Sequence, residues 1–144
     1  MCFKEFWDFV RCCFYVGKGT RNRIFTHLQE LRRILLLGLP KSSTKLRKMA
    51  NIWGNGGKIA IIQIGQDSTN FEAASQEYAI IEAIGLQQLS NKNNATPYGA
   101  MKTIWNKNTI KIFGNSLLLN ALDKAIIDMP QIFLKQDIYV PGLN

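Results

Sequence analysis

Apolar residues recur along the chain at spacings that predict helices connected by short extended segments. Three- and four-residue spacing predicts five helices, over 3–10, 22–37, 46–53, 71–84 and 116–127. A continuous β-branched run over 59–64 predicts a buried strand, and shorter runs over 13–16 and 137–140 predict two more. The expected architecture is an α+β fold in which helices flank a small sheet.

The length of 144 residues is enough for one domain with a buried core. No repeat, low-complexity segment or linker divides the chain. We therefore expect a single domain over 1–144, with a core over about 3–100 and a helical extension over about 101–140.

Residues 14–23 combine an apolar run, a glycine turn and the basic start of a predicted helix. Gly17 and Gly19 allow the backbone to turn sharply and to approach a ligand closely. Lys18, Arg21 and Arg23 place three cations around this turn, so the expected ligand is an anion. The spacing does not fit a Walker loop, and a dinucleotide fingerprint would need a third glycine.

The net charge of +8 is concentrated in about a fifth of the chain. From Lys18 to Lys48, nine basic residues accompany a single acid, Glu30, and elsewhere the bases and acids cancel. This concentration favours a polyanionic partner, most simply nucleic acid, although a solvated basic helical face is the alternative. We assign nucleic-acid binding to Lys18, Arg21, Arg23, Arg32, Arg33, Lys45, Arg47 and Lys48.

The three cysteines, of which Cys12 and Cys13 are adjacent, are typical of reduced thiols in an intracellular protein of the nucleus or cytoplasm. The chain has one histidine and no Cys-x-x-Cys motif, so we do not expect a structural zinc site. The longest apolar run, 34–37, is far shorter than a membrane span, so we expect no membrane partner. Charged residues near the N-terminus argue against a secretory signal.

Arg23 and His27 are the first pair of side chains suited to chemistry. They lie one helical turn apart at the edge of the apolar stripe of 22–37, where we expect them to face the same ligand as Lys18. Each also has a structural interpretation. Arg23 can cover apolar surface with its stem, and His27 can be half-buried and bonded to a backbone group.

Glu77 falls in the middle of a predicted core stripe on the helix 71–84, whereas Glu82 projects to the opposite, solvated side. The stripe consists of Ala73, Ile80, Ile81 and Ile84. A carboxylate placed there needs a cation, a metal ion or a proton. A single carboxylate beside a phosphate is the usual protein contribution to a magnesium site, and a structural ion pair, for example with Arg23, is the alternative.

Together these residues resemble the GIY-YIG nuclease superfamily. Tyr15-Val16-Gly17-Lys18-Gly19 is similar to the second half of the signature, and Arg23 and His27 follow it on the next helix. Glu77 and Asn91 stand where the superfamily has its metal-binding glutamate and its asparagine. A longer stretch, about 3–140, resembles the animal ankyrin-repeat and LEM-domain endonucleases. The matching positions after the signature are His27-Leu28, Ile52-Trp53, Glu72-Ala73, Gln76-Glu77, 83–86, 89–91 and Tyr98-Gly99, with weaker matches from Gly114 to Ile138.

The resemblance implies a small antiparallel sheet and metal-dependent hydrolysis of DNA phosphodiester bonds. Glu77 would hold one divalent ion, Mg²⁺ or Mn²⁺, on the scissile phosphate. Arg23 would neutralise charge in the transition state with help from Lys18. Tyr15 would orient or deprotonate the attacking water, with His27 as the other candidate, and Asn91 would be a supporting hydrogen-bond donor.

The chain departs from the superfamily at its start, because the Gly-Ile-Tyr-like strand that should precede 14–19 is missing. Without that strand the sheet lacks one tyrosine of the site. We therefore expect a DNA endonuclease domain that is either active or has become inactive through this loss. Two other functions stay open. One is a non-catalytic nucleic-acid-binding module derived from such a nuclease, and the other is a protein-interaction module whose charge aids solubility.

Overall fold

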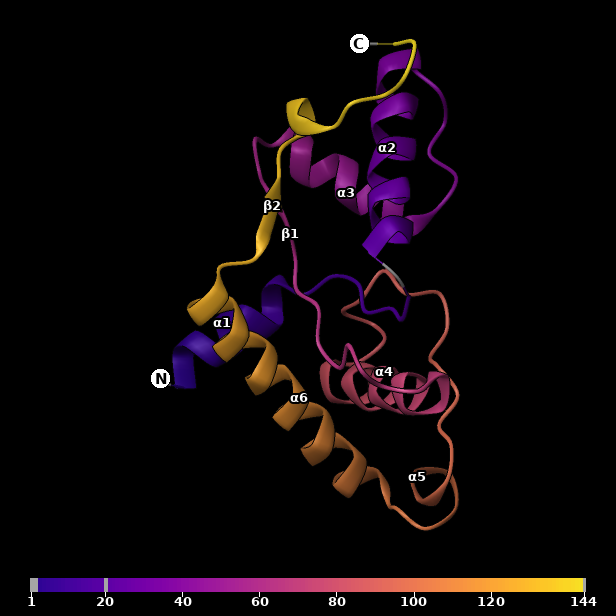
Figure 1. Ribbon diagram of the computed structural model, residues 1–144, viewed down its shortest axis with the longest axis vertical. Helices are drawn as coiled ribbons and strands as arrows, with labels where there is room; N and C mark the ends of the chain where they lie inside the picture. Colours follow the sequence, from indigo (N-terminus) through magenta and orange to yellow (C-terminus); the bar gives the residue numbers. More distant parts are fainter. Residues whose placement is uncertain (1–2, 20, 144) are drawn as a thin grey trace. The chain divides into compact units, whose positions relative to one another are not determined.

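The computed structural model describes residues 3–19 and 21–143, and for Phe3, Arg21 and Asn22 it describes the backbone alone. Within this part the chain forms six α-helices and two short strands (Figure 1). Their order is α1 (Phe3–Cys12), α2 (Arg21–Leu37), α3 (Thr44–Gly54), β1 (Ile59–Ile61), α4 (Asn70–Ile84), α5 (Ala100–Thr103), α6 (Lys107–Asp128), β2 (Gln131–Phe133) and a 3-10 turn, η1 (Lys135–Asp137). The expected α+β class is confirmed.

The elements gather into two compact units that alternate along the chain. The first unit, called unit 1 below, comprises residues 1–18 and 62–130, and unit 2 comprises 19–61 and 131–144. Each unit therefore contains segments that are far apart in the sequence.

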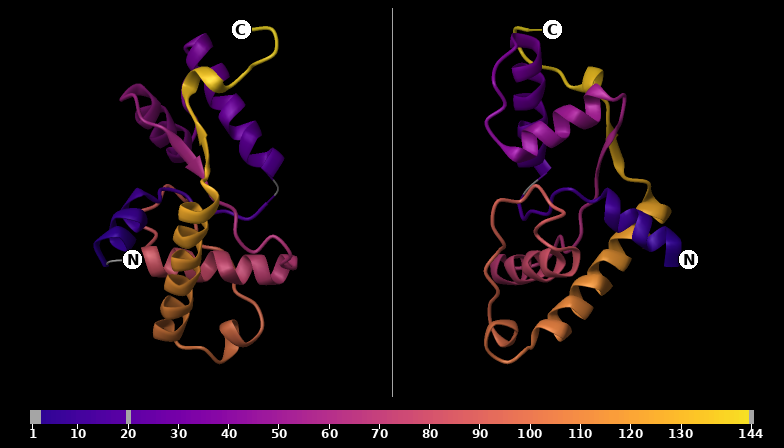
Figure 2. Two further views of the ribbon diagram at one scale, coloured as in Figure 1. Left: turned by 60° about the vertical axis from the view of Figure 1, so that its left-hand side comes forward. Right: turned by 180° about the vertical axis from the view of Figure 1, so that it is seen from behind.

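Unit 1 is built on the packing of α4 against α6, which cross each other in the left view of Figure 2. Val10 from α1, Ile80 from α4 and Leu118 from α6 form one buried cluster. Ala79, Met101 and Ile110 form a second one. Gly114 of α6 lies so close to Ala79 that a Cβ there would overlap the Ala79 carbonyl oxygen. The absent side chain is what allows the two helix backbones to approach.

Unit 2 joins the helix pair α2 and α3 to the two-stranded sheet. β1 and β2 are antiparallel, with Ile59 opposite Phe133 (Figure 2). Apolar side chains of α2 (Leu28, Leu31) and α3 (Leu46, Met49, Trp53) are buried. The Trp53 indole Nε1 donates a hydrogen bond of 3.2 Å to the Phe133 carbonyl oxygen and so ties α3 to β2.

The strands are where the sequence prediction was wrong. The run 59–64 forms a strand over only Ile59–Ile61, and the terminal strand is Gln131–Phe133, with η1 where 137–140 was expected to begin one. Residues 13–16, expected to form a strand, do not form one. The helix predicted over 116–127 begins nine residues earlier, at Lys107, because Asn106 caps it by accepting a hydrogen bond from the Thr109 amide.

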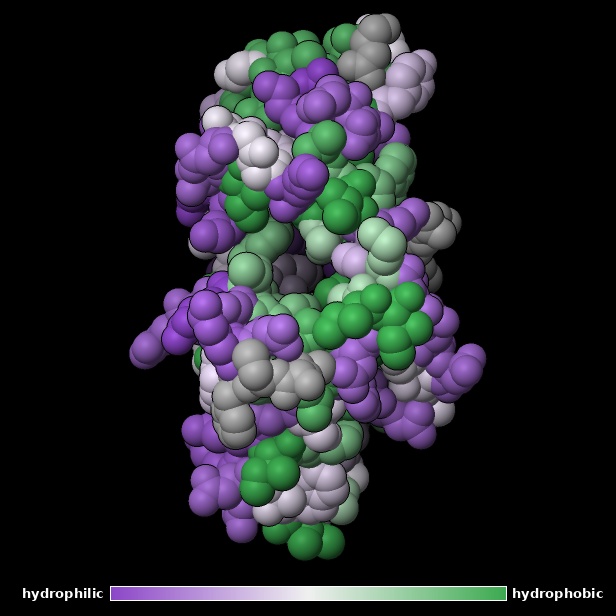
Figure 3. Space-filling view, turned by 90° about the vertical axis from the view of Figure 1, so that its left-hand side faces the viewer, coloured by the Kyte–Doolittle hydropathy of each residue, from purple (hydrophilic) through white to green (hydrophobic). Residues whose placement is uncertain are grey.

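No helix in the described part of the chain has the length and apolarity needed to cross a membrane. Large apolar side chains are nevertheless exposed, among them Ile104, Ile112, Ile127 and Met129. On the face drawn in Figure 3, hydrophobic and hydrophilic side chains are interspersed.

Candidate active site

The segment that carries Tyr15 is held by the loop after α4 instead of by a neighbouring strand. The Asn91 side chain spans the backbone of Val16: its Oδ1 accepts from the Val16 amide at 3.0 Å, and its Nδ2 donates to the Val16 carbonyl oxygen at 2.6 Å. The Ser90 amide and hydroxyl both donate to the Phe14 carbonyl oxygen, at 2.7 and 2.8 Å. Because these partners replace a strand's backbone, 13–16 is not part of the sheet.

This arrangement also orients Tyr15. Cys13 and Val16 pack against the core of unit 1, whereas Tyr15 is 44% exposed. A Cβ on Gly17 would lie 2.8 Å from Cε1 of Tyr15 and 3.1 Å from its hydroxyl oxygen, so the ring lies against the Gly17 backbone. The absence of a side chain at Gly17 therefore leaves room for the ring of Tyr15. The sequence did not reveal this contact between the tyrosine ring and the glycine backbone.

Asn91→Ala should destabilise unit 1. The change removes the hydrogen-bond partner of the part-buried Val16 amide and carbonyl groups. Each buried polar group left unsatisfied lowers the free energy of unfolding by about 1–3 kcal/mol. A thermal melt should show a clearly lower midpoint for Asn91→Ala. Asn93→Ala, at an exposed position of the same loop, is the matched control and should melt like the wild type. Equal midpoints for all three proteins would contradict the bracing role of Asn91.

Glu77 lies on α4 between two buried residues, Ala74 one turn before it and Ile81 one turn after it. The Glu77 side chain is half-buried. The buried positions of α4 are Ala74, Ala79, Ile80 and Ile81, and the half-buried Ile84 packs against the core of unit 1. The predicted stripe was wrong at Ala73, which is half-buried and belongs to neither core cluster. The core face is displaced because α4 buries one side against α6. Glu77 still borders this face.

Glu82 is not on a solvated side, as the sequence had suggested. It is half-buried, and its Oε1 accepts a hydrogen bond of 2.8 Å from Asn94 Nδ2. The α4 helix itself begins at a capping box, in which Thr69 accepts from the Glu72 amide and the Glu72 carboxylate accepts from the Thr69 amide. Glu72 therefore caps α4, and Glu82 holds the loop residue Asn94.

Arg23 and His27 belong to unit 2, as does Lys45 of α3, whose charge acts on His27. His27 Nδ1 is 3.7 Å from the Glu30 Oε2. Burial, then the charge of Lys45, lowers the pKa of His27 below its ordinary 6.5, and Glu30 opposes this shift. Burial, then the charge of Arg23, lowers the pKa of Lys45 below its ordinary 10.5. Near neutral pH His27 is therefore mainly uncharged and able to accept a proton.

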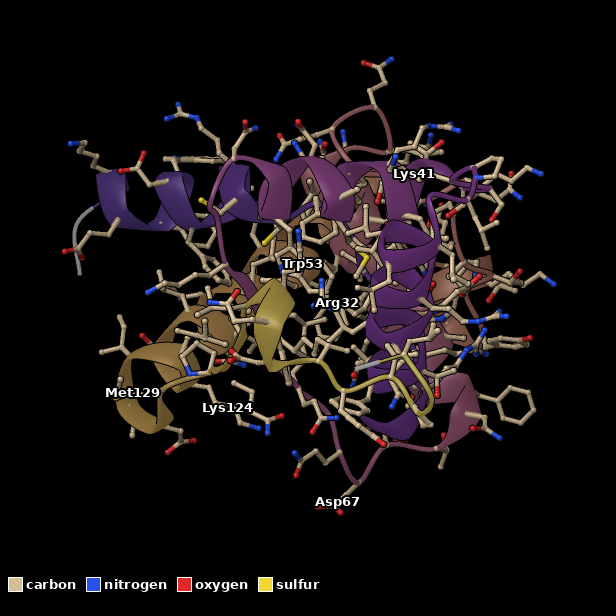
Figure 4. All side chains as sticks on the ribbon, turned by 90° about the horizontal axis from the view of Figure 1, so that it is seen from above. Arg32, Lys41, Trp53, Asp67, Lys124 and Met129 are labelled. Atoms are coloured by element: carbon tan, nitrogen blue, oxygen red, sulfur yellow. The ribbon has the colours of Figure 1, made fainter. Side chains whose placement is uncertain are left out.

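The other basic residues differ in how far they can reach a ligand. Lys18, Arg33, Arg47 and Lys48 are exposed, and the Arg21 side chain lies outside the described part of the chain. Arg32 is half-buried, and its buried Nε has no hydrogen-bond partner among the described residues. Figure 4 shows Arg32 pointing from α2 toward the side on which Trp53 lies. Arg33 is therefore more accessible to a phosphate than Arg32 is.

The basic charge follows the division into units. Unit 2 carries ten lysines and arginines but only two acids, Glu30 and Asp137, whereas unit 1 has eight of each kind. The excess of +8 therefore lies entirely in unit 2. Tyr15, Lys18, Glu77 and Asn91 are in unit 1, whereas Arg23 and His27 are in unit 2, so one site formed by all six residues stays a prediction.

The carboxylate of Glu77 fits one hard divalent ion. The described residues contain no cluster of three or more His, Cys, Asp or Glu that would form a complete metal cage. Mg²⁺ needs no such cage, because it keeps several waters and is commonly bound by one or two carboxylates together with a substrate phosphate. Cys13 is a poor alternative ligand, since burial and then Cys12 raise the pKa of its thiol to about 11.

Comparison with known proteins defines the class of this chain. A sequence model of the LEM-3-like GIY-YIG domain matches residues 2–139, which is nearly the whole chain and includes segments of both units. The chain belongs to this family. No solved structure matches it.

Three relatives share a name, ankyrin repeat and LEM domain-containing protein 1. The chain is 32% identical to the mouse ankyrin repeat and LEM domain-containing protein 1 and 32% identical to the human one, in each case over 93% of the chain. It is 36% identical over 79% of its length to the Caenorhabditis elegans homolog of that protein. The aligned part makes up only 25%, 22% and 16% of these relatives, so the chain corresponds to one region of each.

Proposed function

We propose that this chain is a DNA endonuclease domain that hydrolyses phosphodiester bonds with a divalent metal ion, Mg²⁺ or Mn²⁺. The observation that carries the proposal is the family match over 2–139, which includes Tyr15, Lys18, Arg23, His27, Glu77 and Asn91. The half-buried Glu77 carboxylate supports it, as does the basic charge of unit 2.

In this mechanism, Glu77 would hold the ion, which would supply Lewis-acid stabilisation of the negative charge that develops on the phosphate. Arg23 and Lys18 neutralise negative charge that develops on the phosphate. His27, whose pKa is lowered by burial and by Lys45, accepts a proton from the attacking water, or Tyr15 does so. Asn91 acts in part indirectly, because its amide fixes the backbone beside Tyr15.

A second function is a nucleic-acid-binding module that has lost catalysis. The segregation of +8 into unit 2 favours it, because phosphate binding there does not require Tyr15 or Glu77 of unit 1. Both functions include DNA as the partner, and intracellular location in the nucleus or cytoplasm is part of either proposal.

Nicking of supercoiled plasmid DNA distinguishes the two. The purified chain is incubated with the plasmid and either Mg²⁺, Mn²⁺ or EDTA, and the nicked circular product is measured with time. If the chain is a metal-dependent nuclease, nicked product should form with either metal ion, and none should form with EDTA. Retardation of the plasmid in a gel without nicking under any condition would reject the nuclease in favour of the binding module.

Arg33→Glu should weaken DNA binding at every sequence. Arg33 is an exposed cation of unit 2, and a residue that contacts a phosphate contributes about one unit to the slope of log affinity against log salt. Fluorescence anisotropy at several salt concentrations should show lower affinity and a shallower slope.

Lys111→Glu makes the same change of charge at an exposed position of unit 1 and serves as the control. It should affect affinity much less than Arg33→Glu. If the two variants weaken binding equally, then total charge matters and the basic face of unit 2 is only solvated surface.

A further inference from the structure

We propose that the C-terminal end of α2 is a docking surface for a bilayer with anionic headgroups. The surface, called the leucine tip below, comprises residues 33–41, in which Leu36, Leu37 and Leu39 are exposed. The sequence predicted no membrane partner because no apolar run is long enough to span a bilayer, but docking on a bilayer surface needs no span. The leucine tip is separate from the proposed function, since a lipid headgroup is not the substrate of the nuclease.

The turn that ends α2 holds these leucines in place. Gly38 has a φ of +66°, and the Leu39 amide donates a hydrogen bond of 3.0 Å to the Ile34 carbonyl oxygen. This is the bond of a Schellman motif, which satisfies the free carbonyl groups at the end of a helix. Ile34 is buried, whereas Leu36, Leu37 and Leu39 are 40%, 46% and 43% exposed. An ordered turn therefore presents three apolar side chains to solvent.

The C-terminal segment of the chain adds a fourth leucine. This segment, yellow in Figures 1 and 2, lies beside the C-terminal end of α2, and its Leu143 is exposed. Gln29 of α2 donates a hydrogen bond of 3.2 Å to the Tyr139 carbonyl oxygen and so ties the segment to the helix. At the top of Figure 3, where these segments lie, hydrophobic side chains stand directly above hydrophilic ones.

The charges around the leucine tip all have one sign. Residues 31–57 contain six lysines and arginines and no acid. Arg33 lies one helical turn before Leu37, so the two side chains are neighbours on α2. Lys and Arg near an anionic leaflet strengthen association, and apolar side chains that enter among the headgroups add to it. The exposed cations of this stretch are Arg33, Lys41, Arg47 and Lys48.

The size and composition of the leucine tip favour lipid over other partners. Its three leucines, each less than half exposed, offer far less apolar area than the roughly 800 Å² that each partner contributes to a stable protein interface. The middle of a protein interface is also poor in charged residues, whereas cations flank these leucines. DNA phosphates would pair with the cations but would leave the leucines in water. Anionic lipid satisfies both kinds of side chain.

An apolar end of α6 in unit 1 shows what distinguishes the leucine tip. Ile126, Ile127 and Met129 are 60%, 78% and 77% exposed, which is more than any of the leucines. Asp123 and Asp128 belong to the same end of α6, and an anionic surface would repel them. The assignment therefore rests on the combination of leucines with cations, and not on apolar exposure alone.

Co-sedimentation with lipid vesicles tests the proposal. The purified chain is mixed, without DNA, with phosphatidylcholine vesicles that either contain or lack phosphatidylserine. It should bind the vesicles with phosphatidylserine, and this binding should weaken as salt is added. Lys41→Ala should weaken it about fivefold, the factor for one cation near an anionic leaflet. Leu37→Ser should weaken it about tenfold, because roughly half a leucine side chain no longer leaves water.

Ile127→Ser is the matched control, since it removes a more exposed apolar side chain from the acidic end of α6. It should leave vesicle binding unchanged. An equal loss in Ile127→Ser and Leu37→Ser would overturn the leucine tip. No binding to vesicles with phosphatidylserine, or equal binding to those without it, would overturn the assignment to anionic lipid.

Leu37→Trp guards against a folding defect in Leu37→Ser. Tryptophan is favoured at the membrane interface, so this variant should bind at least as tightly as the wild type. Weaker binding by folded Leu37→Trp would contradict the proposal. A dimer that Leu37→Ser dissociates, in a chain that does not bind vesicles, would assign the leucine tip to a second copy of the chain instead. A chain that binds vesicles but never nicks plasmid would refute the nuclease and leave the lipid surface standing.

Discussion

Gly114→Ala should destabilise unit 1 by about 3 kcal/mol or more, at the upper end of what overpacking costs. The new Cβ would overlap the Ala79 carbonyl oxygen and would also come within 2.8 Å of the Ala83 Cβ. No side-chain rotation relieves an overlap with backbone, so α4 and α6 must move apart. Since the whole stability of a domain is about 5–15 kcal/mol, this one methyl group removes a large fraction of it.

Gly54→Ala is the control for this substitution. Gly54 ends α3, its backbone is not in the left-handed region, and nothing lies within 4 Å of a Cβ built there. Alanine should be neutral or stabilise the protein by up to about 1 kcal/mol. In thermal melts we expect a midpoint roughly 6–12 °C lower for Gly114→Ala and no decrease for Gly54→Ala. A small effect at Gly114 would mean that the α4–α6 contact is looser than described.

Glu77→Gln should abolish the response of the protein to magnesium. A ligand that binds only the folded state stabilises it by about 1.4 kcal/mol at ten times its dissociation constant, or roughly 3–6 °C in a chain of this size. The wild type should show such a rise when Mg²⁺ is added. Glutamine keeps the shape of the side chain but is a neutral and much weaker ligand, so the variant should not.

The same experiment separates a metal ligand from a structural ion pair. If Glu77 instead balances a buried cation, then Glu77→Gln strands that cation and lowers stability by roughly 3–5 kcal/mol without any metal. DNA affinity in the absence of metal gives a second test. It should be retained or slightly higher in Glu77→Gln, because a negative charge is removed while the cations of unit 2 are untouched.

The helices were predictable because their signals are local. The apolar spacing of α2 and α4 and the end of α6 before Met129-Pro130 could be read directly from the sequence. The start of α6 could have been found too, since Asn106 followed by Thr109 is a capping pattern, but the apolar spacing from Lys107 to 115 is weak. Family membership could also be predicted, because the signature residues keep their order.

The strands and the surroundings of the site residues depend on distant partners and could not be predicted in this way. The run 13–16 has the composition of a strand, yet its hydrogen bonds go to Ser90 and Asn91, some 75 residues away. Likewise, β2 pairs with a strand about 70 residues earlier. The lowering of the His27 pKa by the charge of Lys45 likewise depends on a residue of another helix, and no motif in the sequence indicates it.

The central claim is that Glu77 serves metal-dependent cleavage of DNA, and single-turnover cleavage of a labelled DNA tests it most directly. Wild type, Glu77→Gln and Glu72→Gln are compared with saturating Mg²⁺, and Glu72 is the control because glutamine preserves its capping box. A metal ion supplies several kcal/mol of transition-state stabilisation, and each 1.36 kcal/mol is tenfold in rate, so Glu77→Gln should be about a thousandfold slower. Glu72→Gln should cleave at the wild-type rate. Cleavage by Glu77→Gln at the rate of Glu72→Gln would contradict the account.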